Sequence, residues 1–121
     1  MTMNILALAL GGAFGAITRY LVSTMLARQI GIHFPYGTLT VNLIGCFLIG
    51  LSVSFFLDHP NYPSYVKLFM VTGCLGALTT FSTFSFETFE LLRSHTMMGF
   101  LNLGLNVLGG LLAIVIGLKI G

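Results

Sequence analysis

Charged residues are scarce in this sequence. They make up 7% of its 121 residues, whereas 56% are hydrophobic and the mean hydropathy is +1.00. A soluble domain usually carries roughly a quarter charged residues, so this scarcity excludes a soluble globular protein and predicts an integral membrane protein. A helix needs about 20 apolar residues to cross a bilayer. Four such helices with short loops use the whole chain, so we expect a single transmembrane domain over residues 1–121.

Several other features that would indicate a function are also missing. There is no basic run and the net charge is only +2, which argues against a nucleic-acid partner. The two cysteines, Cys46 and Cys74, lie in apolar segments without metal or redox spacing, so we interpret them as packing residues. No pattern of a nucleophile, a metal cluster or a phosphate loop is present, so we expect no enzyme activity. The N-terminus lacks a basic region, and we interpret residues 4–27 as a retained helix.

The apolar runs predict an all-α protein with four transmembrane helices. We expect them at about 4–27, 36–57, 65–92 and 96–119, with the clearest turn at 58–63, which is rich in proline and polar residues. Glycines recur inside each run, and in lipid they allow helix backbones to approach closely. We therefore expect most of these glycines to serve packing.

The basic residues give no preference for one orientation in the membrane. In a four-helix topology Lys67 and Lys119 lie on one side and Arg28 and Arg93 on the other, so the positive-inside rule is balanced. We therefore predict dual insertion, with two oppositely oriented copies pairing about an axis in the membrane plane. The alternative is that a small sample of charges balances by chance.

A few polar residues lie deep within the predicted helices. At a rise of about 1.5 Å per residue, Arg19 lies about 12 Å and Asn42 about 9 Å from the same face of the membrane. Asn102 and Asn106 share one face of the fourth helix and enter from that side too. Polar groups at such depth usually mark a pathway, which predicts a water-filled vestibule in this half of the bilayer. The alternatives are that Arg19 reaches the headgroups and that the asparagines only link helices by hydrogen bonds.

The types of polar group suggest the sign of the permeating species. Arg19 and the amides can donate hydrogen bonds, and no acidic residue lies deep in the first, second or fourth helix. Phe81 and Phe84 can turn the positive edges of their rings toward one small ion. These features favour an anion pathway. Glu87 and Glu90 lie nearer the surface, and solvation there is their alternative interpretation.

Residues 76–80, Gly-Ala-Leu-Thr-Thr, lie near the midpoint of the third predicted helix. A glycine beside β-branched hydroxyl residues predicts a helix break. A break at this depth exposes backbone carbonyls, which would suit a small hard cation such as Na⁺. In an inverted dimer, two chains could share that ion.

Three segments resemble those of the Fluc/CrcB fluoride channels. They are GGAFGAITRY at 11–20, GTLTVNLIG at 37–45 and GCLGALTTFSTFSFE at 73–87, of which the last is highly specific. The resemblance covers the first three helices well and the fourth only loosely. It implies a single transmembrane channel domain in the cell (inner) membrane that exports F⁻ from the cytoplasm, assembled as a dual-topology homodimer with two pores.

The resemblance also implies roles for individual residues. Phe81 and Phe84 would line the pore, Asn42 would be the pore asparagine and Arg19 would lie near the vestibule. The carbonyls of Gly76 and Thr79 would hold a structural Na⁺ that is not transported. The polar track of the third helix would comprise Ser82, Thr83 and Ser85, with Glu87 closing the motif.

The fourth helix departs from the family pattern. Family members often carry a tyrosine and serines on its pore face, where this chain has Asn102, Asn106 and then Gly110. Amides can still donate to an anion, so both asparagines are predicted pathway residues. Ala77 stands where a second glycine is frequent.

Two other functions fit four short helices. A proton-coupled exporter of the small multidrug-resistance type resembles this chain in size and dual insertion, but it carries a glutamate deep in its first helix. This chain has Arg19 there, no acid and no tryptophan. A structural subunit without transport activity is the second alternative.

Overall fold

The computed structural model describes all residues, 1–121, and every regular element in it is a helix. Four helical segments are long and apolar enough to cross a membrane: Thr2–Ile30, Tyr36–Asp58, Ser64–Ser94 and Thr96–Ile120. The first, second and fourth are the continuous helices α1 (Thr2–Ile30), α2 (Tyr36–Asp58) and α6 (Thr96–Ile120). This confirms the predicted all-α architecture with four transmembrane helices.

The third segment is assembled from four shorter pieces. It comprises α3 (Ser64–Lys67), the π-helix η1 (Leu68–Leu75), α4 (Gly76–Leu78) and α5 (Phe81–Ser94). Between α4 and α5 the chain is extended, with φ −82° and ψ 156° at Thr79 and φ −149° and ψ 122° at Thr80. The predicted break is therefore confirmed, at the C-terminal end of residues 76–80.

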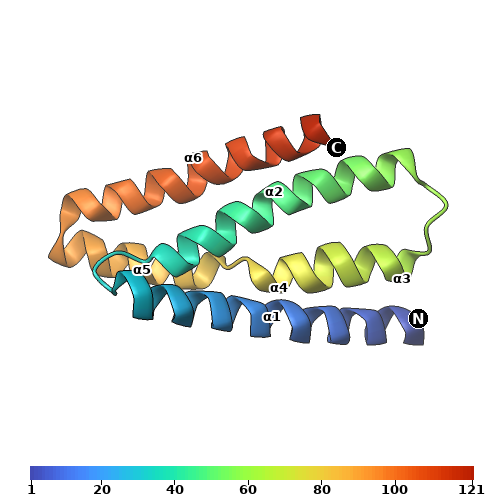
Figure 1. Cartoon of the computed structure of the whole chain (residues 1–121), viewed down its shortest axis with the longest axis horizontal. Coiled ribbons are helices and arrows are strands. Elements are labelled where there is room, and N and C mark those ends of the chain that lie inside the picture. The colour runs from blue at the N-terminus through green and yellow to red at the C-terminus, as the bar shows by residue number, and fades with distance from the viewer.

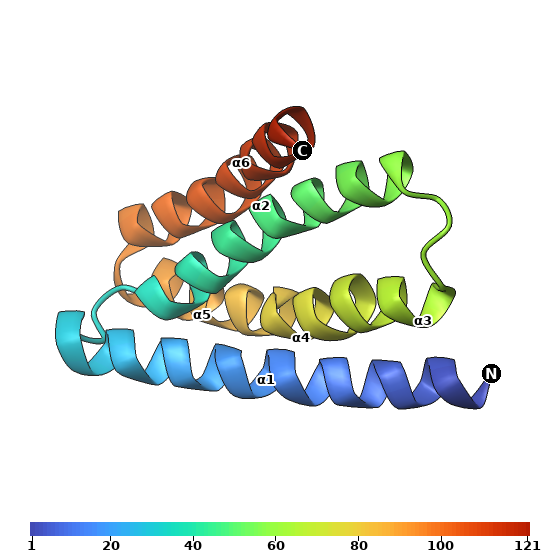
Figure 2. The same cartoon turned by 45° about the vertical axis from the view of Figure 1, so that its right-hand side comes forward.

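The four segments run back and forth along one direction (Figure 1). Both termini and the loop between α2 and α3 lie at one end, and the other two connections lie at the opposite end. The α6 helix packs chiefly against α2, while α1 packs against η1 and α4. Figure 2 shows α6 alongside α2 and the third segment alongside α1. The break in the third segment thus lies in the middle of the bundle.

Glycines lie at close helix contacts, as the sequence predicted. A Cβ built on Gly73 of η1 would lie 2.9 Å from the Cα of Gly11 in α1. A Cβ built on Gly117 of α6 would lie 2.9 Å from the backbone nitrogen of Leu51 and 3.1 Å from the Cα of Gly50 in α2. Real Cβ atoms essentially never come within 3.0 Å of such an atom, so glycine is needed at both contacts. Close backbone approach is the usual basis of helix packing in lipid.

Replacing one of these glycines should loosen the bundle. We expect Gly117→Ala to destabilise the protein by about 1–3 kcal/mol, because the new methyl group overfills the contact between α6 and α2. Gly104→Ala is the matched control on the same helix, since a Cβ there meets nothing within 4 Å. The midpoint of thermal unfolding in detergent should fall for the first variant only. Equal midpoints for both variants would contradict the packing argument.

Candidate functional site

The helix break frees backbone groups that an uninterrupted helix would pair. Thr80 N donates to Asn42 Oδ1 at 2.8 Å instead of to the carbonyl four residues earlier. Asn42 Nδ2 in turn donates to Thr80 O at 3.1 Å. One side chain from α2 therefore pairs with both backbone groups of Thr80. At the start of α5, Thr80 Oγ1 accepts from Thr83 N at 3.2 Å and caps the new helix.

Several carbonyls at the break lack their helical donors, and those of Gly76 and Thr79 are among them. Gly76 O loses its usual donor because Thr80 N is bonded to Asn42. Thr79 O accepts no hydrogen bond, whereas Thr79 N and Thr79 Oγ1 both donate to Leu75 O, at 3.1 and 3.0 Å. Gly76 is exposed on the surface of the single chain. Carbonyl oxygens are ligands that hard cations prefer, so these two fit the predicted Na⁺ ligands.

Arg19 turns toward the break instead of toward the headgroups. Its Nε donates to Ala77 O at 3.0 Å, which supplies a partner for another carbonyl of the interrupted helix. The structure therefore does not show the alternative conformation, in which the Arg19 side chain reaches the membrane surface. A fixed positive charge beside the break also makes the local electrostatic potential more positive, which favours an anion there.

The asparagines form a connected hydrogen-bond network. Asn42 Nδ2 donates to Asn106 Oδ1 at 2.8 Å. Asn106 Nδ2 donates to both O and Oδ1 of Asn102, at 3.0 Å each. Asn102 Nδ2 donates to Thr88 Oγ1 at 2.8 Å. The amides therefore link α2, α5 and α6, which agrees with the interhelical interpretation of these residues.

An open groove on one face of the chain gathers four of the predicted pathway residues, Phe81, Phe84, Asn42 and Asn106. Its volume is about 350 Å³. The Phe81 and Phe84 rings pack edge to face, with centroids 5.7 Å apart and planes inclined at 60°. The remaining lining residues are Cys46, Thr79, Thr80, Val107, Gly110, Leu111 and Ile114.

The two phenylalanines of the groove differ sharply in exposure. Phe84 is 5% exposed, whereas Phe81 is 78% exposed in the single chain. A phenyl ring exposed at the level of the helix break would face lipid or a second protein chain. The groove therefore presents one anchored ring and one ring that projects from the surface.

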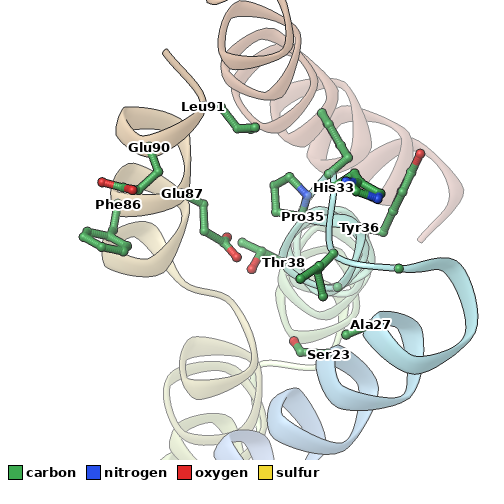
Figure 3. A pocket seen from close by; sticks show the side chains of 14 residues that line it. Ser23, Ala27, His33, Pro35, Tyr36, Thr38, Phe86, Glu87, Glu90 and Leu91 are labelled. Atoms are coloured by element: carbon green, nitrogen blue, oxygen red, sulfur yellow. The ribbon is translucent and has the colours of Figure 1, made fainter. Parts of the chain in front are cut away.

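A second cavity, of about 260 Å³, lies where the end of α1 and the loop before α2 meet α5. Figure 3 shows Glu87 of α5 pointing toward Thr38 of α2, with Ser23, His33 and Glu90 also around the space. Glu87 Oε1 is buried and has no hydrogen-bond partner. This polar cavity lies on the side of the bundle where the sequence predicted a vestibule.

The sequence profile described as "CrcB-like protein, Camphor Resistance (CrcB)" matches residues 6–118 of this chain. The chain belongs to the CrcB family.

Three relatives are each named "Fluoride-specific ion channel FluC". The protein of Dehalococcoides mccartyi is 43% identical over 119 residues, which covers 98% of this chain and 92% of the relative. That of Clostridium perfringens is 47% identical over 116 residues, covering 95% and 91%. That of Aquifex aeolicus is 46% identical over 107 residues, covering 87% and 86%. The similarity therefore spans nearly the whole CrcB chain, including α6.

Some predicted site residues of this CrcB protein lie outside both cavities. Asn102 is 0% exposed and lies behind the groove. Ser82 is exposed, while Thr83 and Ser85 are half-buried, and none of the three lines the groove or the polar cavity. The structure thus separates the polar track of α5 from the phenylalanines. The pathway roles of these four residues stay predictions.

Three threonines of the site make contacts that the sequence did not predict. Thr80 pairs with Asn42, Thr88 accepts from Asn102, and Thr38 lies opposite Glu87. For Thr38 and Thr88 the signal was present in the helical spacing. Thr38 lies four residues before Asn42, and Thr88 lies four residues after Phe84. Residues at this spacing share a helix face.

Proposed function

We propose that this protein is a fluoride-selective channel that lets F⁻ leave the cytoplasm down its electrochemical gradient. The observation that carries the proposal is the near full-length similarity to proteins named fluoride-specific ion channels. The groove adds a physical basis, because it joins two phenyl rings to the amides of Asn42 and Asn106. The function is passive transport, and no catalytic group is needed for it.

The groove chemistry suits a small anion that must shed water. The edge of an aromatic ring carries partial positive charge, and Phe81 and Phe84 hold their rings close together in different orientations. The guanidinium of Arg19 lies near the helix break and favours negative charge there. The polar cavity with Glu87 and Thr38 is the proposed entrance from one face of the membrane. Ser82, Thr83 and Ser85 would then lie along the α5 side of the route.

A second copy of the chain is proposed to complete the pathway. Phe81 projects from the single chain, and Gly76 is exposed in the middle of an apolar segment. An unpaired carbonyl facing hydrocarbon costs several kcal/mol, so a partner or an ion must cover the break. The balanced basic residues favour an antiparallel partner, which makes a dual-topology homodimer.

The freed carbonyls of Gly76 and Thr79 are the proposed ligands of a structural Na⁺. Carbonyls from both copies would meet at the dimer axis and together hold the ion. The bound ion would satisfy oxygens that otherwise lack hydrogen-bond donors. It would stabilise the dimer and would not be transported.

Ion efflux from liposomes tests the function. Vesicles that contain the purified protein and a mixture of fluoride and chloride should release F⁻ when a K⁺ ionophore sets the voltage, and should retain Cl⁻. Exchange of organic cations for protons would instead support the multidrug exporter, although α1 has no acidic residue for that coupling. Vesicles as tight to F⁻ as protein-free vesicles would refute the channel and favour a structural subunit.

Removing Na⁺ should weaken the dimer. We expect the fraction of dimer in detergent to fall when Na⁺ is replaced by N-methylglucamine, because the carbonyls at the break lose their cation. Crosslinking yield or size-exclusion chromatography would measure the change. Restoring Na⁺ should recover the dimer, and Li⁺ or K⁺ at equal ionic strength would show whether the effect is specific. A dimer indifferent to all these cations would contradict the Na⁺ site.

A further inference from the structure

A chain of hydrogen bonds begins and ends on the third membrane segment and passes through two other helices. Thr80 N donates to Asn42, Asn42 donates to Asn106, Asn106 donates to Asn102, and Asn102 donates to Thr88. The four donor–acceptor distances lie between 2.8 and 3.0 Å. The chain thus connects the helix break to the middle of α5 by way of α2 and α6. Only its first part touches the groove.

Asn102 is the least accessible member of this chain. It is 0% exposed and does not line the groove, so it lies away from any ion there. Its Oδ1 accepts from Asn106 and its Nδ2 donates to Thr88. Rotating its amide by half a turn would bring Nδ2 against Nδ2 of Asn106. Its orientation therefore depends on a hydroxyl acceptor at one end and an amide donor at the other.

The orientation of Asn102 determines the orientations of the two amides that line the groove. Asn106 Nδ2 donates to the side-chain Oδ1 of Asn102 and also to the backbone carbonyl oxygen of that residue, so Asn106 Oδ1 is turned toward Asn42. Asn42 must then present Nδ2 to Asn106, which leaves its Oδ1 for Thr80 N. Each amide thereby fixes the next. Buried networks of this kind act as a unit.

We infer that Asn102 and Thr88 are positioning residues for conduction, which act by fixing the amides of Asn42 and Asn106 at the groove wall. The inference rests on the proposed channel function. In this inference Asn102 does not contact the ion but fixes the neighbouring amide. Thr88 fixes Asn102 in turn, a role that its place in α5 alone does not suggest. Both residues act through the orientation of Asn106.

The test removes single members of the chain with little change in shape. Thr88→Val replaces one hydroxyl by a methyl group, Thr88→Ser keeps the hydroxyl, and Asn102→Leu replaces the amide. Each variant is reconstituted, and voltage-driven F⁻ efflux is measured per folded dimer, together with retention of Cl⁻. We expect Thr88→Val and Asn102→Leu to lower F⁻ efflux about tenfold, the factor that corresponds to one buried hydrogen bond. Thr88→Ser should restore wild-type efflux.

A control separates positioning from general stability. Phe56 is 9% exposed and packs near the loop after α2, far from the network. Phe56→Leu should lower the midpoint of thermal unfolding but leave F⁻ efflux per folded dimer unchanged. The double variant Thr88→Val with Asn102→Leu should show the same F⁻ efflux per folded dimer as the single variant with the lower efflux. The reason is that both changes break the same chain of hydrogen bonds.

The outcomes distinguish the inference from the function. If the wild type conducts F⁻ and Thr88→Val conducts equally well per folded dimer, the inference is overturned and the channel function stands. If the losses of the two single variants multiply in the double variant, the residues act separately and the inference is also overturned. A wild type without F⁻ efflux overturns the channel function itself. Should Asn102→Leu fail to fold, Thr88→Val and Thr88→Ser decide the question alone.

Discussion

Phe81→Ile is expected to lower fluoride efflux about a hundredfold and to leave a folded protein. Phe81 is 78% exposed in the single chain, so its ring contributes little to the packing of one protomer. Its contacts of interest are with Phe84, at 5.7 Å between ring centroids, and with the open groove. Isoleucine fills a similar volume but has no ring edge with partial positive charge. Losing about 3 kcal/mol of stabilisation for the dehydrated ion would slow its passage about a hundredfold.

The matched control for this prediction is Phe89→Ile. Phe89 lies on the same helix, is 55% exposed and lines neither the groove nor the polar cavity. Size-exclusion chromatography would verify that both variants remain dimeric, and a fluoride electrode would report efflux from liposomes. Phe89→Ile should match the wild type. If Phe81→Ile also matched it, the groove would lose its role as the F⁻ pathway.

The sequence predicted most of the fold because the signal for membrane helices is strong. Hydropathy identified all four spans, and their ends differ from the structure by only a few residues, as at Thr2 and Ile30 of α1. The glycine and threonines at residues 76–80 also placed the break correctly. The π-helix Leu68–Leu75 was not predicted. This π-helix packs against α1, and such a contact between distant segments gives no local sequence signal.

The sequence was less informative about the site, because the partners of a polar side chain come from other helices. Helical spacing correctly placed Phe81 and Phe84 together, and counting from the helix ends placed Asn42 and Asn106 in the same half of the membrane. It could not show that Asn42 pairs with both backbone groups of Thr80. It also could not predict that Asn102 points away from the groove, since α6 is apolar on several faces and gives little directional signal.

The polar track shows a similar limit. Ser82 and Ser85 share a face of α5 at i, i+3 spacing, but Thr83 lies about 100° around the helix from Ser82 and points in another direction. One run of hydroxyl residues therefore cannot lie along a single face. In the single chain Ser82 is exposed, whereas Thr83 and Ser85 are half-buried. A continuous route past all three would need surfaces that the proposed second chain would supply.

Asn42→Asp should reduce fluoride efflux about a thousandfold. The aspartate keeps an oxygen to accept from Thr80 N, but it has no donor for Thr80 O or for Asn106 Oδ1. Its carboxylate would place a negative charge on the groove wall. Two like charges about 4 Å apart repel by about 4 kcal/mol at an effective dielectric constant near 20. That energy corresponds to about a thousandfold in rate, since each 1.4 kcal/mol is tenfold.

Two further variants separate the charge from the loss of hydrogen bonds. Asn42→Leu removes every bond that Asn42 makes and adds no charge, so Thr80 loses partners for both of its backbone groups. We therefore expect Asn42→Leu to yield less folded dimer than Asn42→Asp, because each unpaired backbone group in the membrane costs several kcal/mol. Asn61→Asp makes the same chemical change in the exposed loop after α2 and should have no effect. Wild-type efflux by Asn42→Asp would place the F⁻ pathway away from Asn42, since a fixed anion beside the route must slow a permeating anion.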